Sequence, residues 1–298
     1  MKGTIYGIAA YGLWGLFPIY WKLLDKVPSV EILGHRIIWS FVLLLFLLRI
    51  MGYTVIPWQF RQNPKAIPIS VLAALLLAGN WLTFLFAVTS GYIVEASLGY
   101  FINPLFSIVL GMLFLHERPR PGQWLAISAA VAGVLYLTFM YGSFPWIALT
   151  LTFTFGIYGL IRKTMALNSL QGLSVETGLL CLPAIILFII LESRGMLHFG
   201  HTSPAIHFWL ITAGAVTAAP LLLFAAAARR VPLTHLGFLQ YLAPTLQFLL
   251  GVFIYHEPFS KNRLAGFSLI WFAIIIYIVE STLNRQRQKS ISQFNYSK

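Results

Sequence analysis

Two stretches of this chain share one pattern at a fixed separation. Residues 101–117 read FINPLFSIVLGMLFLHE, and residues 241–257 read YLAPTLQFLLGVFIYHE. A proline, a glycine and a closing His-Glu pair recur at the same places in both. Each copy lies in an apolar segment long enough to cross a bilayer, which takes about 20 residues. A membrane protein made of two similar halves is typical of transporters, whose solute site lies between the halves.

The composition indicates a protein that is folded in lipid. Hydrophobic residues make up 59% of the 298 residues and charged residues only 9%, whereas a soluble domain carries about 25% charged residues. The net charge of +12 is spread between apolar segments rather than gathered on one face, which argues against nucleic-acid binding. The single cysteine, Cys181, excludes an internal disulfide bond and a multi-cysteine metal site.

Hydropathy predicts an all-α integral membrane protein with ten transmembrane helices. Each candidate span is close to the length that a bilayer needs. The spans are 3–22, 32–50, 68–89, 93–115, 123–141, 144–161, 174–192, 207–228, 234–255 and 264–283.

The positions of the basic residues predict the orientation. With the N-terminus in the cytoplasm, most of the 20 lysine and arginine residues fall on the cytoplasmic side, including Arg162, Lys163 and the tail after Arg285. Cytoplasmic loops carry this excess in membrane proteins. We therefore expect a multi-pass cell (inner) membrane protein with both termini in the cytoplasm.

Ten spans in two halves give five spans per half. Because five is odd, the second half must enter the membrane from the opposite side, which predicts an inverted repeat. We expect five-helix repeats at 1–142 and 143–285 and a basic cytoplasmic tail at 286–298. Weaker echoes of the repeat are the strings Ser29-Val30-Glu31 and Ser174-Val175-Glu176, and the matched pairs Gly15 with Gly156 and Lys22 with Lys163.

Several strings together resemble the RarD branch of the EamA-type drug/metabolite transporters, over about residues 7–277. The strings are His35-Arg36-Ile37-Ile38-Trp39-Ser40, Gly79-Asn80-Trp81, the run from Glu95 to Leu105, and the run from Gln240 to Thr245. One departure is that the family's frequent Gly-Glu after spans four and nine reads His116-Glu117 and His256-Glu257 here. The resemblance implies ten helices, a central cavity walled mainly by helices one to four and six to nine, and peripheral fifth and tenth helices. It implies no particular substrate.

Charged and amide side chains inside the spans are the candidate cavity residues, because polar groups at membrane depth normally face protein or water. Arg36 and Glu95 both fall toward the outer side, where they form either a structural ion pair or a gate that contacts the solute. Glu95 is also the candidate for handling a coupling proton. Asn80, Asn103 and Gln240 either bind neighbouring helices or contact solute.

Prolines and aromatic residues complete the candidate site. Pro104 and Pro244 each free a backbone carbonyl group and are interpreted as hinges, with a static kink as the alternative. Trp39, Trp81, Tyr100, Tyr158 and Tyr241 lie inside spans, where they either pack or line a cavity for an aromatic or organic-cation-like solute.

These observations together predict a secondary transporter, an exporter or exchanger, that moves a small organic metabolite or drug-like solute by alternating access. There is no Gly-x4-Gly-Lys-Ser/Thr string for ATP, and we expect no cofactor, no metal and no enzymatic activity. The expected partners are the solute, a coupling proton and the lipid bilayer, for a monomer or homodimer. A lipid flippase or scramblase, a membrane-embedded enzyme and a passive channel are the alternatives.

Overall fold

The computed structural model describes residues 2–54, 64–90, 92–255 and 261–296. Every regular element within these residues is a helix. The helices are α1 (Lys2–Trp21), α2 (Ser29–Ile50), α4 (Ala66–Thr89), α5 (Ile93–Leu115), α6 (Pro121–Tyr141), α7 (Trp146–Thr164), α8 (Ser169–Ser193), α9 (Pro204–Ala228), α10 (Leu233–Gln240), α11 (Leu242–Leu249) and α12 (Lys261–Tyr296). Short helical turns, η1 (Lys22–Leu24) and η2 (Leu250–Ile254), follow α1 and α11.

Each predicted span corresponds to a helix, or to a run of helices in the case of the ninth span. Within the described residues, eight of these segments are long and apolar enough to cross a membrane, and the run Leu233–Ile254 counts as one of them. Two further long helices, α1 and α7, are not identified as membrane spans by their length and composition. Glycine and aromatic residues lower the hydropathy of α1, and threonine residues lower that of α7.

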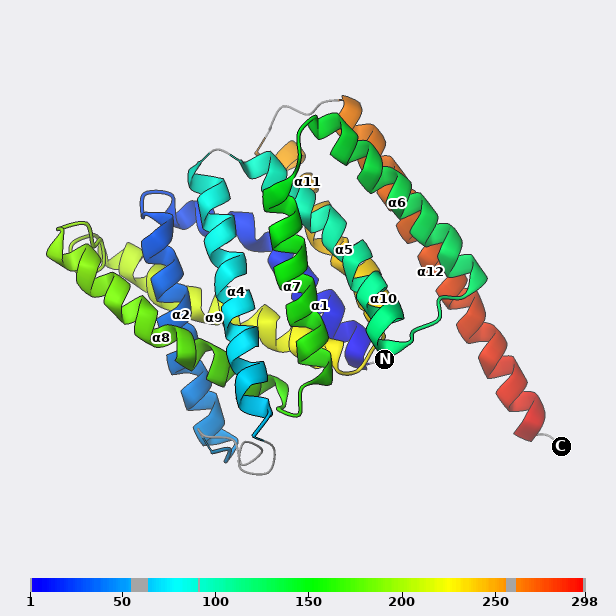
Figure 1. Ribbon diagram of the computed structural model, residues 1–298, viewed down its shortest axis with the longest axis horizontal. Coiled ribbons are helices and arrows are strands. Elements are labelled where there is room, and N and C mark those ends of the chain that lie inside the picture. Colours follow the sequence, from blue (N-terminus) through cyan, green and yellow to red (C-terminus); the bar gives the residue numbers. More distant parts are fainter. Residues whose placement is uncertain (1, 55–63, 91, 256–260, 297–298) are drawn as a thin grey trace.

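Both of these less apolar helices lie inside the bundle. The helix α1 packs against α9, α10 and α11, and α7 packs against α4, α5 and α9. In Figure 1, α6 and α12 run side by side along one edge of the molecule, which is the peripheral placement expected for the fifth and tenth helices. A bidentate ion pair between Arg120 and Glu280, with Nη2–Oε2 at 2.7 Å, joins these two helices.

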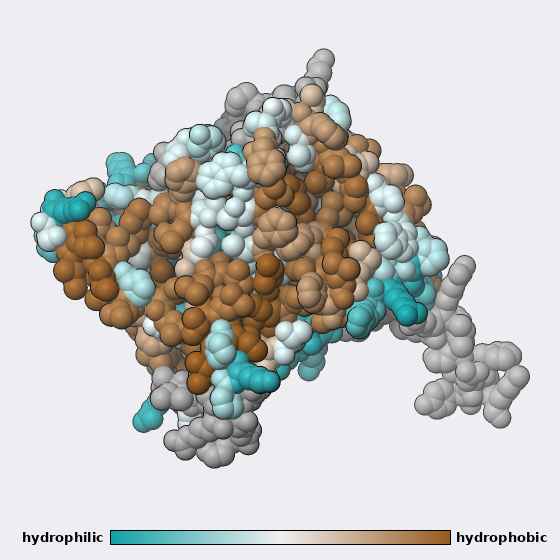
Figure 2. Space-filling view, in the orientation of Figure 1, coloured by the Kyte–Doolittle hydropathy of each residue, from teal (hydrophilic) through white to brown (hydrophobic). Residues whose placement is uncertain are grey.

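The outer surface of the bundle is apolar. Large side chains such as Leu75, Phe139 and Phe253 are 62%, 79% and 69% exposed. Figure 2 shows apolar residues across the broad face, with hydrophilic residues gathered toward its edges. A soluble monomer rarely exposes so large an apolar surface, so this surface fits the hydrocarbon core of a bilayer. The chain is a multi-pass membrane protein.

Glycine lets the helices of the two predicted halves approach closely. A Cβ atom added at Gly237 in α10 would lie 2.6 Å from the carbonyl oxygen of Pro104 in α5. A Cβ atom at Gly99 in α5 would lie 3.0 Å from the carbonyl oxygen of Ala148 in α7. Small residues at such crossings are the usual means of packing helices in lipid.

The hydrogen-bond pattern of the predicted ninth span is interrupted at Tyr241, whose backbone stays helical with φ −62° and ψ −14°, although its counterpart is continuous. The helix α10 ends at Gln240 and α11 begins at Leu242, followed by the π-helical turn Leu250–Ile254. Pro244 lacks an N–H group and cannot bond the carbonyl group of Gln240, four residues earlier. By contrast, α5 runs without a break through Pro104. The two prolines therefore have different effects on their helices.

Candidate functional site

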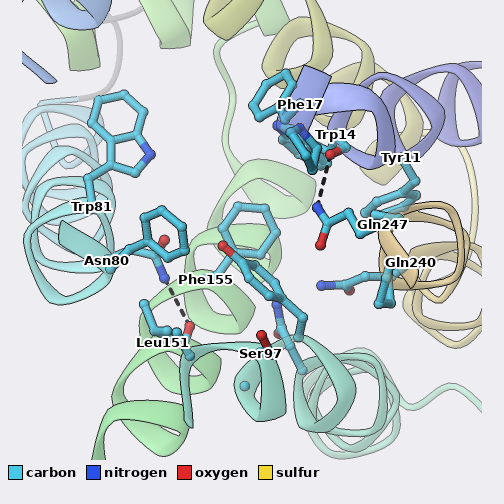
Figure 3. Close-up of a pocket in the computed structure, with 18 of the residues that line it drawn as sticks. Tyr11, Trp14, Phe17, Asn80, Trp81, Ser97, Leu151, Phe155, Gln240 and Gln247 are labelled. Atoms are coloured by element: carbon cyan, nitrogen blue, oxygen red, sulfur yellow. Dashed lines mark hydrogen bonds between the residues drawn. The ribbon is translucent and has the colours of Figure 1, made fainter. Parts of the chain in front are cut away.

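A cavity of about 280 Å³ lies between helices from both ends of the chain. Its walls come from α1, α2, α4 and α5 and from α7, α9, α10 and α11. The lining residues are Tyr11, Trp14, Phe17, Pro18, Trp21, Arg36, Asn80, Trp81, Phe84, Ala96, Ser97, Gly99, Tyr100, Asn103, Leu151, Phe155, Thr217, Leu221, Gln240, Ala243, Pro244 and Gln247. In Figure 3, Asn80 reaches in from one side and Gln240 and Gln247 from the other, with Ser97 between them. The volume suits a small organic solute.

Arg36 is the charged side chain of this lining. Its Nε atom donates a hydrogen bond of 3.0 Å to Thr217 Oγ1 in α9. The guanidinium carbon lies 5.0 Å from the ring centroids of both Trp21 and Trp81, so the cation is held between two indole rings. Such cation–π contacts favour a guanidinium group where water is scarce.

The amide side chains have different roles. Asn80 Nδ2 donates to the Leu151 carbonyl oxygen and to Thr154 Oγ1, both at 3.0 Å, and so joins α4 to α7 at the cavity wall. Gln247 Nε2 donates to the Trp14 carbonyl oxygen at 3.0 Å. In the described part of the chain, the amide of Gln240 makes no hydrogen bond, and the buried Asn103 Oδ1 has no partner. The last two residues have bonding capacity left for a solute.

The aromatic wall of the cavity is larger than the sequence analysis predicts. The predicted residues Trp81 and Tyr100 are joined by Tyr11, Trp14 and Phe17 of α1, Phe84 of α4 and Phe155 of α7. The rings of Trp14 and Phe155 lie edge to face at 5.7 Å. The sequence of α1 contains a pattern that could have predicted this wall. Its residues Tyr11, Trp14, Pro18 and Trp21 are spaced by three or four residues and so share one helical face.

Four predicted residues are not brought to the cavity. The Trp39 indole donates to His35 Nδ1 at 3.0 Å, on the side where His35 packs between Phe188 and Phe199. Tyr158 is fully buried and donates to Glu176 Oε2 at 3.0 Å. Tyr241 is also fully buried, and its hydroxyl group donates to the Phe101 carbonyl oxygen. All three aromatic residues have polar partners inside the protein, which explains why they turn away from the cavity.

Glu95 is the fourth of these residues. Its Oε1 atom accepts a hydrogen bond of 2.7 Å from the backbone N–H of Ile147, in the first turn of α7. Unpaired N–H groups and the helix dipole make this end of a helix favourable for a carboxylate. Among the described ion pairs there is none between Arg36 and Glu95. The two residues lie in separate environments, one in the cavity and one at a helix end.

The hinge candidates also differ in position. Pro244 lines the cavity next to the break between α10 and α11. Pro104 lies within the continuous helix α5, and its carbonyl oxygen faces Gly237. Glu257 and His256, which close the second copy of the repeat, lie outside the described residues. In the first copy, His116 ends α5 with a left-handed φ of 54°, the conformation that explains the family's frequent glycine at this place.

A buried ion pair that the sequence analysis does not predict lies outside the cavity. Arg162, predicted to lie in a cytoplasmic loop, is 1% exposed near the end of α7. Its Nη1 atom lies 3.1 Å from Glu176 Oε1, and Nη2 donates to the Ser169 carbonyl oxygen at 2.9 Å. A Cβ atom at Gly172 would overlap this guanidinium group, so the small residue makes room for it.

The acid that the sequence repeat aligns with Glu176 is Glu31, and it is also fully buried. Glu31 accepts hydrogen bonds from the backbone N–H groups of His198, at 3.0 Å, and Phe199, at 2.8 Å. The Nδ1 atom of His198 lies 3.0 Å from Glu31 Oε2. Glu31 therefore links the connection between α8 and α9 to α2.

Within the described ranges, no group of three or more His, Cys, Asp or Glu residues is placed to hold a metal ion.

Comparisons with known proteins agree with this fold. The model of the EamA-like transporter family matches residues 1–139 and 144–279. An uncharacterized transporter, YojE, of Bacillus subtilis (strain 168) is 44% identical over 97% of each chain. Protein RarD of Escherichia coli (strain K12) is 44% identical over 96% of this chain and 97% of its own. A solved structure described as the crystal structure of a protein superposes with a TM-score of 0.67 at 17% identity, over 93% of this chain and 97% of that one, which supports the fold alone.

The apolar helical bundle and its internal cavity define a multi-pass membrane transporter. The chain belongs to the EamA-like transporter family, and within that family to the RarD branch. Membership of a transporter family implies that the chain is not an enzyme.

Proposed function

We propose that this transporter moves a small organic solute through the central cavity by alternating access. The observation that carries the proposal is a cavity whose walls come from both halves of the sequence repeat. In transporters with inverted repeats, the solute binds where the halves meet, and one half rocks against the other.

Contacts between repeat-equivalent residues support the inverted repeat. Tyr241 bonds Phe101, which is 140 residues earlier, and Trp14 packs on Phe155, its equivalent at a shift of 141. A residue that touches its own equivalent lies close to a two-fold axis, as at the centre of a symmetric dimer interface. These two contacts fit a pseudo-two-fold axis through the cavity region.

A second kind of contact, made twice between the halves, supports the same symmetry. A Cβ atom at Gly15 in α1 would meet Leu246 in α11, and a Cβ atom at Gly156 in α7 would meet Phe106 in α5. Both pairs are related by the repeat. Their agreement supports the interpretation of α1 and α7 as equivalent membrane spans. Adding these two spans to the other eight gives ten transmembrane helices, which fits two five-helix repeats at 1–142 and 143–285. The orientation with both termini in the cytoplasm of the inner membrane, and the basic tail at 286–298, follow from the sequence argument.

The break beside Pro244 is the proposed moving part. Pro244 leaves the carbonyl group of Gln240 without its helical N–H partner at membrane depth, and such groups are tolerated where they border a cavity. Since α5 is continuous through Pro104, we propose that α11 moves more than the equivalent part of α5. The proposed direction is export or exchange, driven by the gradient of the solute or by a proton.

A transport assay with a blocked cavity tests this function. Ser97, exposed on the cavity side of α5, is replaced by tryptophan in the full chain, which is reconstituted into liposomes and screened with a panel of radiolabelled small organic solutes. The control variant is Leu125→Trp, at a 61% exposed position on α6. We expect solute accumulation in the wild type and in Leu125→Trp, and its loss in Ser97→Trp. Equal accumulation in all three proteins would contradict transport through this cavity.

A further inference from the structure

The charge of the cavity wall has one sign. Arg36 is the charged residue among the described lining residues, and that lining contains no aspartate, glutamate or histidine. The other polar contributions come from amide and hydroxyl groups, such as those of Gln240, Asn103 and Tyr100. The expectation of an organic-cation-like solute is therefore not supported, because a cation would meet Arg36 with no carboxylate to offset the repulsion.

The guanidinium group of Arg36 is only partly satisfied by the protein. Its Nε–H bonds Thr217, and two indole rings flank the group. Among the described residues, no carboxylate lies within 4.0 Å of it, and its two Nη atoms have no hydrogen-bond partner. The two cation–π contacts stabilise it by about 0.5–2 kcal/mol each, while a charge at membrane depth costs about 3 kcal/mol or more.

Arg162 in the same protein has protein partners for both of its Nη atoms, unlike Arg36. Arg162 is more deeply buried than Arg36, at 1% exposed, and its Nη atoms bond the Glu176 carboxylate and the Ser169 carbonyl oxygen, while its Nε atom has no partner among the described residues. Arg36 lines the cavity, and among the described residues its Nη atoms have no such partner. A planar edge with free N–H groups matches a carboxylate in a bidentate arrangement.

We infer that the transported solute is an organic anion, with one carboxylate group that Arg36 binds and an aromatic or alkyl body that the ring wall holds. The inference rests on the proposed function and gives its substrate class. The aromatic wall of Trp14, Phe17, Phe84 and Phe155 provides apolar surface for the body. The free amide of Gln240 provides one further polar contact.

Equilibrium binding to the full chain in lipid nanodiscs tests this inference without depending on transport. The probes are 3-phenylpropionate, 3-phenylpropionamide and 3-phenylpropylamine, which share a body and differ in charge. We expect the wild type to bind the carboxylate roughly 10-fold or more tightly than the amide, as for a charge-assisted hydrogen-bonded pair, and the amine most weakly. In Arg36→Gln the carboxylate should bind no more tightly than the amide, and Arg36→Lys should keep part of the preference.

The control is Arg49→Gln, at the other end of α2, which should bind like the wild type. Thr217→Val, which removes the Nε partner and one hydroxyl group of the lining, should weaken carboxylate binding by less than Arg36→Gln and supplies a second test if Arg36→Gln does not fold. Wild-type binding of amide or amine as tight as that of the carboxylate would overturn the inference. So would an unchanged preference in Arg36→Gln, or failure of a whole panel of aryl and alkyl carboxylates to bind.

The same measurements separate this inference from the proposed function. Charge-selective binding with no solute movement in liposomes would overturn the transport proposal and leave the anion site standing. The opposite result is transport of neutral or cationic solutes that is blocked in Ser97→Trp and unchanged in Arg36→Gln. That result would overturn the anion site and leave the transport proposal standing.

Discussion

The hydroxyl group of Tyr241 donates a hydrogen bond to the carbonyl oxygen of Phe101, the residue at the same place in the other copy of the repeat. The bond joins α5 to the break between α10 and α11. At 3.3 Å it is long for an O–H donor and therefore weak. The proximity of the two equivalent residues is more informative than the strength of their bond, because it is what a pseudo-two-fold axis near the crossing of the two helices would produce.

Close packing, rather than hydrogen bonding, should hold this crossing together. Gly237→Ala would force a methyl group against the Pro104 carbonyl oxygen, and such overpacking costs about 1–3 kcal/mol. Tyr241→Phe, which removes the weak bond, should cost less than about 1 kcal/mol. Thermal unfolding in detergent should show a clear loss for Gly237→Ala and a small one for Tyr241→Phe. The opposite order would contradict this account of the crossing.

Glu95 should act as a helix cap rather than as a proton carrier. Glu95→Gln keeps an oxygen that can accept from Ile147 N–H but loses the charge that favours the α7 N-terminus, at a cost of about 1 kcal/mol. We expect a slightly lower melting temperature and an unchanged dependence of transport on pH. Loss of proton-gradient dependence at wild-type stability would instead identify Glu95 as the coupling site.

The Arg162–Glu176 pair should show strong coupling. Both side chains are 0% exposed, and removal of one partner from a buried pair costs about 3–5 kcal/mol. We therefore expect Arg162→Met to unfold at a much lower temperature than the wild type, and Arg162→Met/Glu176→Gln to recover part of that loss. The measurement is thermal unfolding of all four members of the cycle. A double variant as unstable as the sum of the single variants would show that the pair is not coupled.

His116 stores a small amount of backbone strain that glycine should release. Its left-handed conformation at the end of α5 costs a residue with a Cβ atom about 1–2 kcal/mol. His116→Gly should therefore stabilise the protein, whereas Gly142→Ala, at the left-handed end of α6, should destabilise it. Melting temperatures that move in the same direction for both variants would contradict this explanation.

The sequence could predict the fold and part of the cavity for identifiable reasons. Arg36, Asn80, Asn103 and Gln240 are polar groups in apolar segments, and the cost of leaving them in lipid directs them inward. The aromatic residues carry no such constraint, since a ring packs in a core, in a wall or against lipid. The orientations of Trp39, Tyr158 and Tyr241 depend on partners in distant helices, which the sequence does not reveal.

The burial of Arg162 could not be predicted from the sequence for a different reason. A basic residue beside a predicted span end is normally a loop residue, and only the fold brings Glu176 and Gly172 around it. In the same way, the repeat aligned Glu31 with Glu176 but could not show that one binds backbone N–H groups and the other an arginine. Equivalent positions in the two halves have acquired different partners.

The central claim, access to one cavity from each side in turn, is tested most directly by labelling Ser97→Cys in a Cys181→Ala background. A membrane-impermeant maleimide small enough to enter the cavity is applied separately to inside-out and right-side-out vesicles that contain a trapped thiol. Alternating access predicts labelling of Cys at this position from both sides, while the trapped thiol stays unmodified because no continuous pore exists. Labelling from one side only, or modification of the trapped thiol, would contradict alternating access.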